Sequence, residues 1–408
     1  MKKVLVIIDE YRPDNNANST CIENIIDELN SIYDVTVFTS KINKTYKEDV
    51  ERKELVIRYS NIYLKLYKRY SEGAMNLLLK AVFRVFNTIF VNFFWADINY
   101  LWYVSQKKKM LRDVKNNNYD FIISTSGSFA VQQVGLYISN KTGIPWFAYF
   151  NDPLPDKNHL FGIRKNYGMN IYKQSREVFE RAKGIIFNKH LYQSYIQDKS
   201  YNQFSYKIYE IDYPLVKPIA IMNKNPKNRF TIVYAGALYR SIRNPQYILP
   251  ILVDLSKRID IEVHFLGGGD CSDILKDYDY NYDWFFYHGQ LTIDEARSYI
   301  YKSNMLINIG NKVENQTPSK IFEYISTGKQ ICNFYFNEYD TSMHYLERYR
   351  NSISIKVDSM DSKALVERII DFIKHNEEIM TAEEIKDLFI KNTPTYAKEK
   401  FISLFKSV

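Results

Sequence analysis

The sequence predicts an α/β protein with two doubly wound domains, each built on a parallel sheet. Its 408 residues exceed what one hydrophobic core usually supports. Short apolar runs alternate with helical patterns along the chain, which is typical of a parallel sheet covered by helices on both faces. The alternation stops at a polar, proline-containing stretch, residues 217–228, and then starts again. We therefore expect a domain over 1–216, a linker, and a second domain over 229–380.

The first domain should contain seven strands. The apolar run at 4–8 is too short for the core of a signal peptide and has no small-residue cleavage site after it, so a buried strand is the better interpretation. Thr20 and Glu23 have the spacing of a capping box, which predicts a helix that runs through Leu29. The strands are expected at 4–8, 35–38, 55–59, 121–124, 146–150, 185–187 and 208–211.

The second domain should contain six strands, at 231–235, 262–266, 284–287, 305–309, 331–335 and 353–357. Helix starts are predicted at Asn244-Pro245 and at Thr317-Pro318, because a proline at the first helical position lacks an N–H that would have no partner there. Residues 381–408 have a helical pattern with a break at Pro394. One arrangement for this segment is that it crosses back from the second domain and packs on the first.

Composition narrows the class of protein. With 46% hydrophobic and 25% charged residues the chain is an ordinary globular protein rather than a disordered one. A formal charge of +8 favours an anionic partner, which can be a nucleotide, a nucleic acid or a lipid surface. Cys21, Cys271 and Cys332 lie far apart, which suits a reducing cytoplasm and supports neither a disulfide framework nor a zinc site.

A polar cluster follows the strand expected at 305–309. Thr317 is the predicted N-cap and Pro318 the first helical residue, and a helix start of this kind binds phosphate through its free N–H groups. Glu323 could accept hydrogen bonds from two ribose hydroxyls. The alternative is a solvated helix start with an ion pair between Lys320 and Glu323. The cluster comprises Asn315, Gln316, Thr317, Pro318, Ser319, Lys320 and Glu323.

A second cluster follows the strand expected at 231–235. Gly236 permits close approach of the backbone to a ligand, and Arg240 or Arg243 could neutralise a diphosphate through bidentate contacts. Taken singly, these arginines are ordinary surface residues. Together with a phosphate-binding helix start, they favour a nucleoside diphosphate as the ligand.

The order of these motifs resembles a known family. Gly-x-Leu-Tyr-x-x-x-Arg-Asn-Pro at 236–245 is followed by Tyr-His-Gly at 287–289 and by Pro-Ser-Lys-x-x-Glu-Tyr at 318–324. This is similar to the donor domain of GT-B fold glycosyltransferases, close to glycosyltransferase family 4 of the capsule and lipopolysaccharide type. The resemblance implies that Glu323 binds the donor ribose, that the region of Arg240 and Arg243 together with Lys320 contacts the diphosphate, and that the loop at His288 touches the base. Many members carry a glutamate at the position of Asn315.

The first half resembles the acceptor domain of the same family more weakly. There, an acidic residue after the fifth strand lines the site near the reacting sugar, which nominates Asp152, although an Asp-Pro turn explains it as well. Ser126 and Gly127 either offer N–H groups to the acceptor or cap a helix. The first loop lacks the GxGxxG of dinucleotide-binding dehydrogenases and also the Gly-Gly pair common in the transferases. Arg12 and Asn15 are candidates to replace that pair on the acceptor side.

The segment 62–115 contains an apolar and aromatic run at 77–95 that is interrupted by Lys80 and Arg84. Charges inside the run argue against a membrane-spanning helix. With basic residues flanking it, the run suits an interfacial helix in peripheral contact with an anionic membrane. A helix buried in the core, with a solvated polar stripe, is the other interpretation.

The resemblance implies transfer of a hexose from a nucleoside diphosphate sugar to a saccharide, with retention of configuration. We expect a lipid-linked acceptor, a role in bacterial surface polysaccharide synthesis, and a location in the cytoplasm or on the inner face of the membrane. Asp152, Arg240 and Lys320 are the catalytic candidates. No metal and no cofactor beyond the donor are expected, because basic side chains and a helix dipole can neutralise the leaving diphosphate. The rivals are a non-catalytic transferase-like subunit and a nucleotide-sugar epimerase. Nucleic-acid binding is disfavoured, since no motif organises the basic residues.

Overall fold

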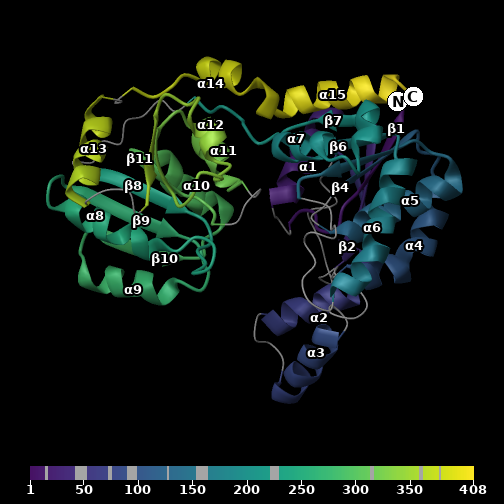
Figure 1. Ribbon diagram of the computed structural model, residues 1–408, viewed down its shortest axis with the longest axis horizontal. Helices are drawn as coiled ribbons and strands as arrows, with labels where there is room; N and C mark the ends of the chain where they lie inside the picture. The colour runs from purple at the N-terminus through teal and green to yellow at the C-terminus, as the bar shows by residue number, and fades with distance from the viewer. Residues whose placement is uncertain are drawn as a thin grey trace. The chain divides into compact units, whose positions relative to one another are not determined.

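The structure is a computed structural model of the chain, and it describes residues 1–13, 17–41, 53–71, 76–89, 99–125, 128–152, 164–220, 229–312, 317–357, 362–375 and 378–408. These residues form two compact units (Figure 1). The N-terminal unit is Met1–Pro214 together with Pro394–Val408, and the C-terminal unit is Leu215–Thr393. Within the described residues, no helix combines the length and the apolarity needed to cross a membrane.

The N-terminal unit is built on a seven-stranded parallel sheet with the order β3-β2-β1-β4-β5-β6-β7. The order reverses between β1 and β4, as in doubly wound folds. Each predicted strand of this half is present. The central strands β1, β4, β5 and β6 are buried on both faces and are therefore continuous apolar runs in the sequence. The strands are β1 (Lys3–Ile7), β2 (Asp34–Lys41), β3 (Leu55–Ser60), β4 (Phe121–Thr125), β5 (Trp146–Phe150), β6 (Gly184–Phe187) and β7 (Ile208–Glu210).

Helices connect these strands. They are α1 (Ala17–Leu29), α2 (Ile62–Ser71), α3 (Leu77–Ile89), α4 (Tyr100–Lys115), α5 (Phe129–Thr142), α6 (Arg164–Arg181), α7 (Lys189–Gln197) and the 3₁₀-helix η4 (Asn202–Lys207). The prediction of a capping box at Thr20 is wrong, because α1 already includes Ala17. Glu23 instead forms an ion pair with Arg12, at 2.7 Å between Oε2 and Nε.

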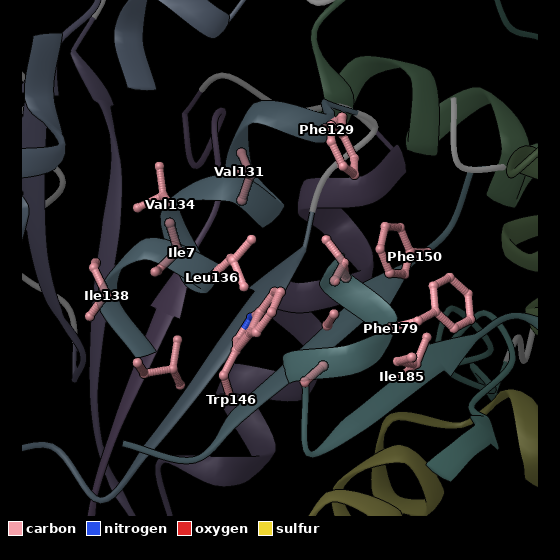
Figure 2. Close-up of a cluster of buried hydrophobic side chains, with 14 of the residues drawn as sticks. Ile7, Phe129, Val131, Val134, Leu136, Ile138, Trp146, Phe150, Phe179 and Ile185 are labelled. Atoms are coloured by element: carbon pink, nitrogen blue, oxygen red, sulfur yellow. The ribbon is translucent and has the colours of Figure 1, made fainter. Parts of the chain in front are cut away.

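Helix α5 packs on β4 and β5 through Trp146, whose side chain lies among those of α5 in Figure 2. The indole Nε1 donates to Ser124 Oγ at 2.7 Å, and Gln132 Nε2 donates to the carbonyl oxygen of Tyr149 at 3.1 Å. Gly135 is required at this contact, since a Cβ there would lie 2.4 Å from the indole nitrogen. These contacts fix the carboxyl ends of β4 and β5, where the predicted acceptor residues follow.

The C-terminal unit has a six-stranded parallel sheet with the order β10-β9-β8-β11-β12-β13, which reverses between β8 and β11. All six predicted strands are present. The strands are β8 (Phe230–Ala235), β9 (Ile261–Leu266), β10 (Phe285–Gly289), β11 (Met305–Ile309), β12 (Gln330–Tyr335) and β13 (Ser352–Lys356). The helices are η5 (Pro245–Tyr247), α8 (Leu249–Ser256), α9 (Ser272–Asn281), α10 (Ile293–Lys302), α11 (Lys320–Ser326), α12 (Met343–Leu346), α13 (Ser362–His375), α14 (Ala382–Leu388) and η6 (Ile390–Asn392).

The end of the chain is divided between the units, whereas the sequence suggested one segment over 381–408. Helix α14 stays with the C-terminal unit, capped by Thr381 and tied by an ion pair between Arg350 and Glu384. The following helix, α15 (Pro394–Lys406), packs against α1 in the N-terminal unit (Figure 1). Its Phe405 is buried and stacks on Phe121 with ring centroids 4.3 Å apart. The division falls at Pro394, which cannot continue the preceding helical turn.

Candidate functional site

The carboxyl edge of the C-terminal sheet gathers glycines and charged side chains. Open α/β sheets bind ligands at this edge, where the strand order reverses. Four adjacent strands meet glycine there: Gly236 follows β8, Gly267 follows β9, Gly289 ends β10, and Gly310 follows β11. At Gly267 and Gly310 neighbouring atoms of the protein occupy the space of a side chain, whereas an added Cβ at Gly289 would meet nothing within 4 Å, so a ligand can approach the backbone at Gly289.

Residues 267–269 form a triple-glycine loop whose backbone contacts the loop after β8. Gly267 has φ +130° and Gly269 has φ +122°, which side-chain-bearing residues rarely adopt. A Cβ at Gly267 would lie 2.1 Å from the carbonyl oxygen of Gly236, and one at Gly269 would lie 1.9 Å from that of Leu238. This loop was not predicted, although three consecutive glycines after an expected strand are a visible signal.

Arg243 lies at the point where β8 and β11 diverge. Its Nε donates to Asn311 Oδ1 at 2.6 Å, just beyond the end of β11. A Cβ built on Gly236 would lie 3.8 Å from its NH1 atom, which places the guanidinium beside the end of β8 as well. Burial raises the pKa of Tyr234, and the neighbouring Arg243 charge opposes that rise. A planar guanidinium at this place suits bidentate contact with a phosphate.

Arg240, three residues earlier, is held elsewhere. Its backbone N–H donates to Asp270 Oδ1 at 2.8 Å, and its guanidinium pairs with Asp273 in the first turn of α9. Both of these ion-pair side chains are exposed. The charge of Arg240 is therefore balanced by Asp273, which the sequence pattern could not reveal. Of the two arginines, Arg243 is the one that lies at the strand-order reversal.

Asp340 follows β12 and is buried beside Gly310, where an added Cβ would overlap its Oδ2 atom. Its Oδ1 accepts from the backbone N–H of Ser342 at 2.9 Å, whereas Oδ2 has no hydrogen-bond partner in the described part of the chain. Burial raises the pKa of the Asp340 carboxyl, and hydrogen bonds from Ser342 and the charge of Arg243 oppose that rise. Asp340 was not among the predicted site residues, because nothing in its polar loop sets it apart in the sequence.

Glu323 is held between two cations. Lys320 Nζ lies 2.5 Å from its Oε2, and Arg297 Nε lies 3.3 Å from its Oε1. The Lys320–Glu323 ion pair weighed from the sequence is therefore present, and Arg297 is a partner that the sequence did not indicate. Helix α11, which carries Lys320 and Glu323, is anchored to the end of β8, because the Tyr324 hydroxyl accepts from the Ala235 N–H at 2.8 Å.

The predicted start of this helix is wrong by two residues. Helix α11 begins at Lys320 with Ser319 at the N-cap, and no side chain caps it. Thr317, the predicted cap, forms a hydrogen bond to Thr341 Oγ1 at 2.8 Å instead, and Pro318 precedes the helix. A tertiary contact with the loop after β12 thus replaces the local one. Asn315 and Gln316 lie outside the described residues.

His288, at the carboxyl end of β10, belongs to a chain of three polar side chains. Its Nε2 lies 2.9 Å from His264 Nδ1, and His264 Nε2 lies 2.6 Å from Glu262 Oε1. The His288 ring also packs against Tyr299, with centroids 4.7 Å apart. Burial lowers the pKa of His288, and the adjacent His264 lowers it further. These contacts orient the imidazole at the end of β10, where the family resemblance predicts contact with the nucleotide base.

The carboxyl edge of the N-terminal sheet carries amides that hydrogen-bond to one another and to a carboxylate. After β1, Asn99 Nδ2 donates to Asp9 Oδ2 at 2.9 Å, and Asn61 Nδ2 donates to Asn99 Oδ1 at 2.8 Å. After β5, the carbonyl oxygen of Asn151 accepts from Asn188 Nδ2 at 2.8 Å. The buried side-chain amide of Asn151 has no hydrogen-bond partner among the described residues. None of these residues was predicted from the sequence.

The predicted acceptor-side residues have separate surroundings. Asp152 accepts a hydrogen bond from Asn18 Nδ2 on α1 at 2.9 Å. Arg12 is held by the α1 carboxylates Glu23 and Asp27, at 2.7 and 3.2 Å. Asn15, Ser126 and Gly127 lie outside the described residues. Within the described ranges, no group of three or more His, Cys, Asp or Glu side chains is arranged to hold a metal ion.

Comparison with known proteins identifies the fold. No protein-family model and no curated protein sequence matches the chain. Among solved structures, a glycosyltransferase from Rickettsia africae aligns with 100% of this chain and 98% of its own, at 12% identity and a TM-score of 0.65. HepE from Anabaena, in complex with UDP and glucose, aligns over 100% of both chains at 12% identity and a TM-score of 0.63. The lipopolysaccharide outer core galactosyltransferase WaaB aligns over 99% of both at 11% identity and a TM-score of 0.59.

These likenesses extend over both units. Together with the two doubly wound sheets, they establish that the chain has the GT-B fold. The predicted fold class is confirmed.

Proposed function

We propose that this protein transfers a glycosyl group from a nucleoside diphosphate sugar to a saccharide acceptor, and that its C-terminal unit binds the donor. The observation that carries the proposal is the position of Arg243 at the strand-order reversal, beside a sheet edge made of glycines. A backbone without side chains and a guanidinium suit a diphosphate. HepE, which has the same fold, was solved with UDP and glucose.

In this proposal the bond between the anomeric carbon and the diphosphate oxygen breaks, and a bond to an acceptor hydroxyl forms. Arg243 and Lys320 stabilise the charge that develops on the departing diphosphate, with Arg240 contributing once it leaves Asp273. Glu323 accepts hydrogen bonds from the ribose hydroxyls. In the proposed reaction Asp152, which accepts a hydrogen bond from Asn18, acts on the acceptor side and receives or orients the hydroxyl proton. No metal takes part in the proposed step.

The finer features of the proposal come from the sequence resemblance to family 4. They are a hexose donor, retention of configuration, a lipid-linked acceptor, and a role in bacterial surface polysaccharide synthesis at the cytoplasmic face of the membrane. The formal net charge of the chain, +8 at pH 7, supports an anionic donor.

The test is thermal unfolding of the purified protein with UDP, GDP, dTDP, CMP or NAD. A ligand at a hundred times its Kd stabilises the folded state by about 2.7 kcal/mol. One nucleoside diphosphate should give such a shift, and Glu323→Ala should abolish it. Glu367→Ala is the matched control, because Glu367 also pairs with an arginine of the C-terminal unit, Arg258, at an exposed position.

Two outcomes would change the proposal. If no nucleotide stabilises the protein, the chain is a transferase-like subunit without a donor site. If a nucleotide sugar is bound but is converted to its epimer without any acceptor, the protein is an epimerase of the same fold.

A further inference from the structure

Asp340 stands at the end of a chain of polar side chains that crosses the C-terminal sheet. Asn308 on β11, Asn333 on β12 and Ser354 on β13 lie opposite one another in the strand register. Asn308 Nδ2 donates to Asn333 Oδ1 at 2.7 Å, and Asn333 Nδ2 donates to Ser354 Oγ at 3.2 Å. Asn308 Nδ2 also lies 3.5 Å from Ser342 Oγ, and the Ser342 hydroxyl donates to Asp340 Oδ1. Hydrogen bonds from inside the unit therefore hold one oxygen of the Asp340 carboxylate.

The other oxygen of this carboxylate has no such support. Asp340 is only 5% exposed, and its Oδ2 forms no hydrogen bond in the part of the chain that the structure describes. Oδ2 lies against the backbone of Gly310 at the end of β11, since a Cβ added there would be 1.6 Å from it. Folded proteins pair nearly all of their buried polar atoms, because an unpaired one is destabilising. An unpaired oxygen on an otherwise ordered carboxylate indicates that a ligand supplies the missing donor.

Arg243 acts on this carboxylate without being its hydrogen-bond partner. Burial raises the pKa of the Asp340 carboxyl and the charge of Arg243 opposes that rise, so the two groups are close enough to interact. Arg243 Nε nevertheless donates to Asn311 Oδ1, at 2.6 Å. The guanidinium is engaged by an amide and the carboxylate by a serine, so both retain hydrogen-bonding capacity for a ligand.

We propose that Asp340 binds a hydroxyl group of the sugar carried by the nucleoside diphosphate, and that it selects neutral sugars over sugar acids. The inference rests on the proposed function, in which Arg243 binds the diphosphate. Asp340 follows β12, the neighbour of β11, and adjacent strands lie about 5 Å apart, so a sugar joined to that diphosphate comes within reach of the carboxylate. A carboxylate accepts a strong hydrogen bond from a hydroxyl and repels a second carboxylate.

The experiment is calorimetric titration at pH 7 with UDP, UDP-glucose, UDP-galactose and UDP-glucuronate. The corresponding dTDP or GDP compounds replace them if one of those nucleotides is the one that stabilises the protein. The parent should bind the better of the two hexose compounds at least tenfold more tightly than the uronate. Asp340→Asn replaces a charge-assisted hydrogen bond by a neutral one, so its Kd for the hexose compound should rise roughly tenfold. Its preference over the uronate should disappear, and its Kd for the bare nucleotide should stay unchanged.

Two further variants show whether the effect belongs to this carboxylate. Glu338→Gln is the matched control, because Glu338 is an exposed carboxylate of the same loop that pairs with Lys356, and this variant should bind like the parent. Ser342→Ala removes the hydroxyl that orients Asp340 and should weaken the preference for the hexose in part. Thermal unfolding checks that all three variants are folded.

The outcomes separate this inference from the proposed function. An unchanged preference in Asp340→Asn would overturn the inference and leave the proposed function intact, because the nucleotide would still bind. Equal affinity of the parent for the hexose and the uronate compounds would do the same. If no nucleoside diphosphate binds, the proposed function fails and the role of Asp340 in sugar selection fails with it.

Discussion

The two sheets share a topology and differ in the chemistry of their carboxyl edges. In both, the strand order reverses beside the first strand of the unit, between β1 and β4 and between β8 and β11. The C-terminal edge carries glycines, Arg243, Glu323 and Asp340. The N-terminal edge carries amides that hydrogen-bond to one another, such as Asn61 and Asn99. One topology therefore supports two kinds of site.

The glycines of the two units also differ in where they stand and in what they do. In the described part of the N-terminal unit, Gly135 and Gly184 relieve crowding against Trp146 and Phe147, and Gly143 ends helix α5. These glycines serve packing and capping. In the C-terminal unit, Gly328 follows helix α11, but Gly236, Gly267, Gly289 and Gly310 stand where strands turn into loops. Exposed backbone and cations suit a polyanion, whereas amides suit a neutral, hydroxyl-rich ligand, and it is the side chains rather than the topology that differ between the two edges.

The largest expected effect concerns the N-terminal unit, which takes one of its helices from the end of the chain. Phe405 is buried and contacts Phe121, Phe147 and Tyr33. Phe405→Ala should therefore destabilise this unit by about 3–5 kcal/mol in urea unfolding. Leu388→Ala, at a half-exposed position of α14, is the control and should change little. If nucleotide binding is a property of the C-terminal unit, it should survive Phe405→Ala at low denaturant. If Phe405→Ala and Leu388→Ala lowered the free energy of unfolding equally, the packing of Phe405 would make no specific contribution to the stability of the N-terminal unit.

The next effect tests the glycine edge. Gly267→Ala introduces a Cβ at φ +130° and 2.1 Å from the carbonyl oxygen of Gly236. We expect a loss of about 1–3 kcal/mol from backbone strain, and more if the loop after β8 must move. Gly268→Ala is the neighbouring control, since the nearest atom to its added Cβ lies 4.0 Å away. Thermal unfolding of the two variants side by side decides the matter, and similar melting temperatures would mean that the loop is not tightly packed.

Arg243→Ala tests the charge at the strand-order reversal. Charge-assisted hydrogen bonds contribute about 1.5–3 kcal/mol each, so the Kd for the preferred nucleoside diphosphate should rise by roughly 10- to 100-fold in calorimetric titration. Arg258→Ala removes an exposed arginine of the same unit and should leave the Kd unchanged. A normal Kd in Arg243→Ala would assign the diphosphate to Arg240 or Lys320 instead.

The smallest effect is expected at Asp340, where burial raises the carboxyl pKa. A raised folded-state pKa stabilises the fold below the ordinary value of about 4, and this stabilisation is lost as the pH rises through the folded-state pKa. Asp340→Asn should therefore increase stability at pH 7, by on the order of 1 kcal/mol, and should bring no gain near pH 3. Unfolding at both pH values measures the difference. A destabilised variant at pH 7 would mean that attraction to Arg243 outweighs the burial of the charge.

The sequence by itself located the strands of the two described sheets, because most strands of a parallel sheet are buried on both faces and appear as unbroken apolar runs. The GT-B fold was indicated by the resemblance of the motifs to family 4. The sequence also indicated Arg243, Lys320 and Glu323, since a glycine after a strand and cations near a helix start are local signals. The starts of helices were predicted less accurately than the strands. At Thr317, for example, a hydrogen bond to Thr341 replaced the expected cap.

Only the tertiary structure decided which residues meet. Arg240 and Arg243 look equivalent in sequence, but Asp273 from α9 engages the first and Asn311 from the end of β11 engages the second. Asp340 joins this site from a loop about a hundred residues further along the chain, beyond the reach of any local pattern. The apolar spacing of α3 is the same for a buried helix and an exposed one. Which side of a helix is covered depends on what packs against it, and packing is set by the whole fold.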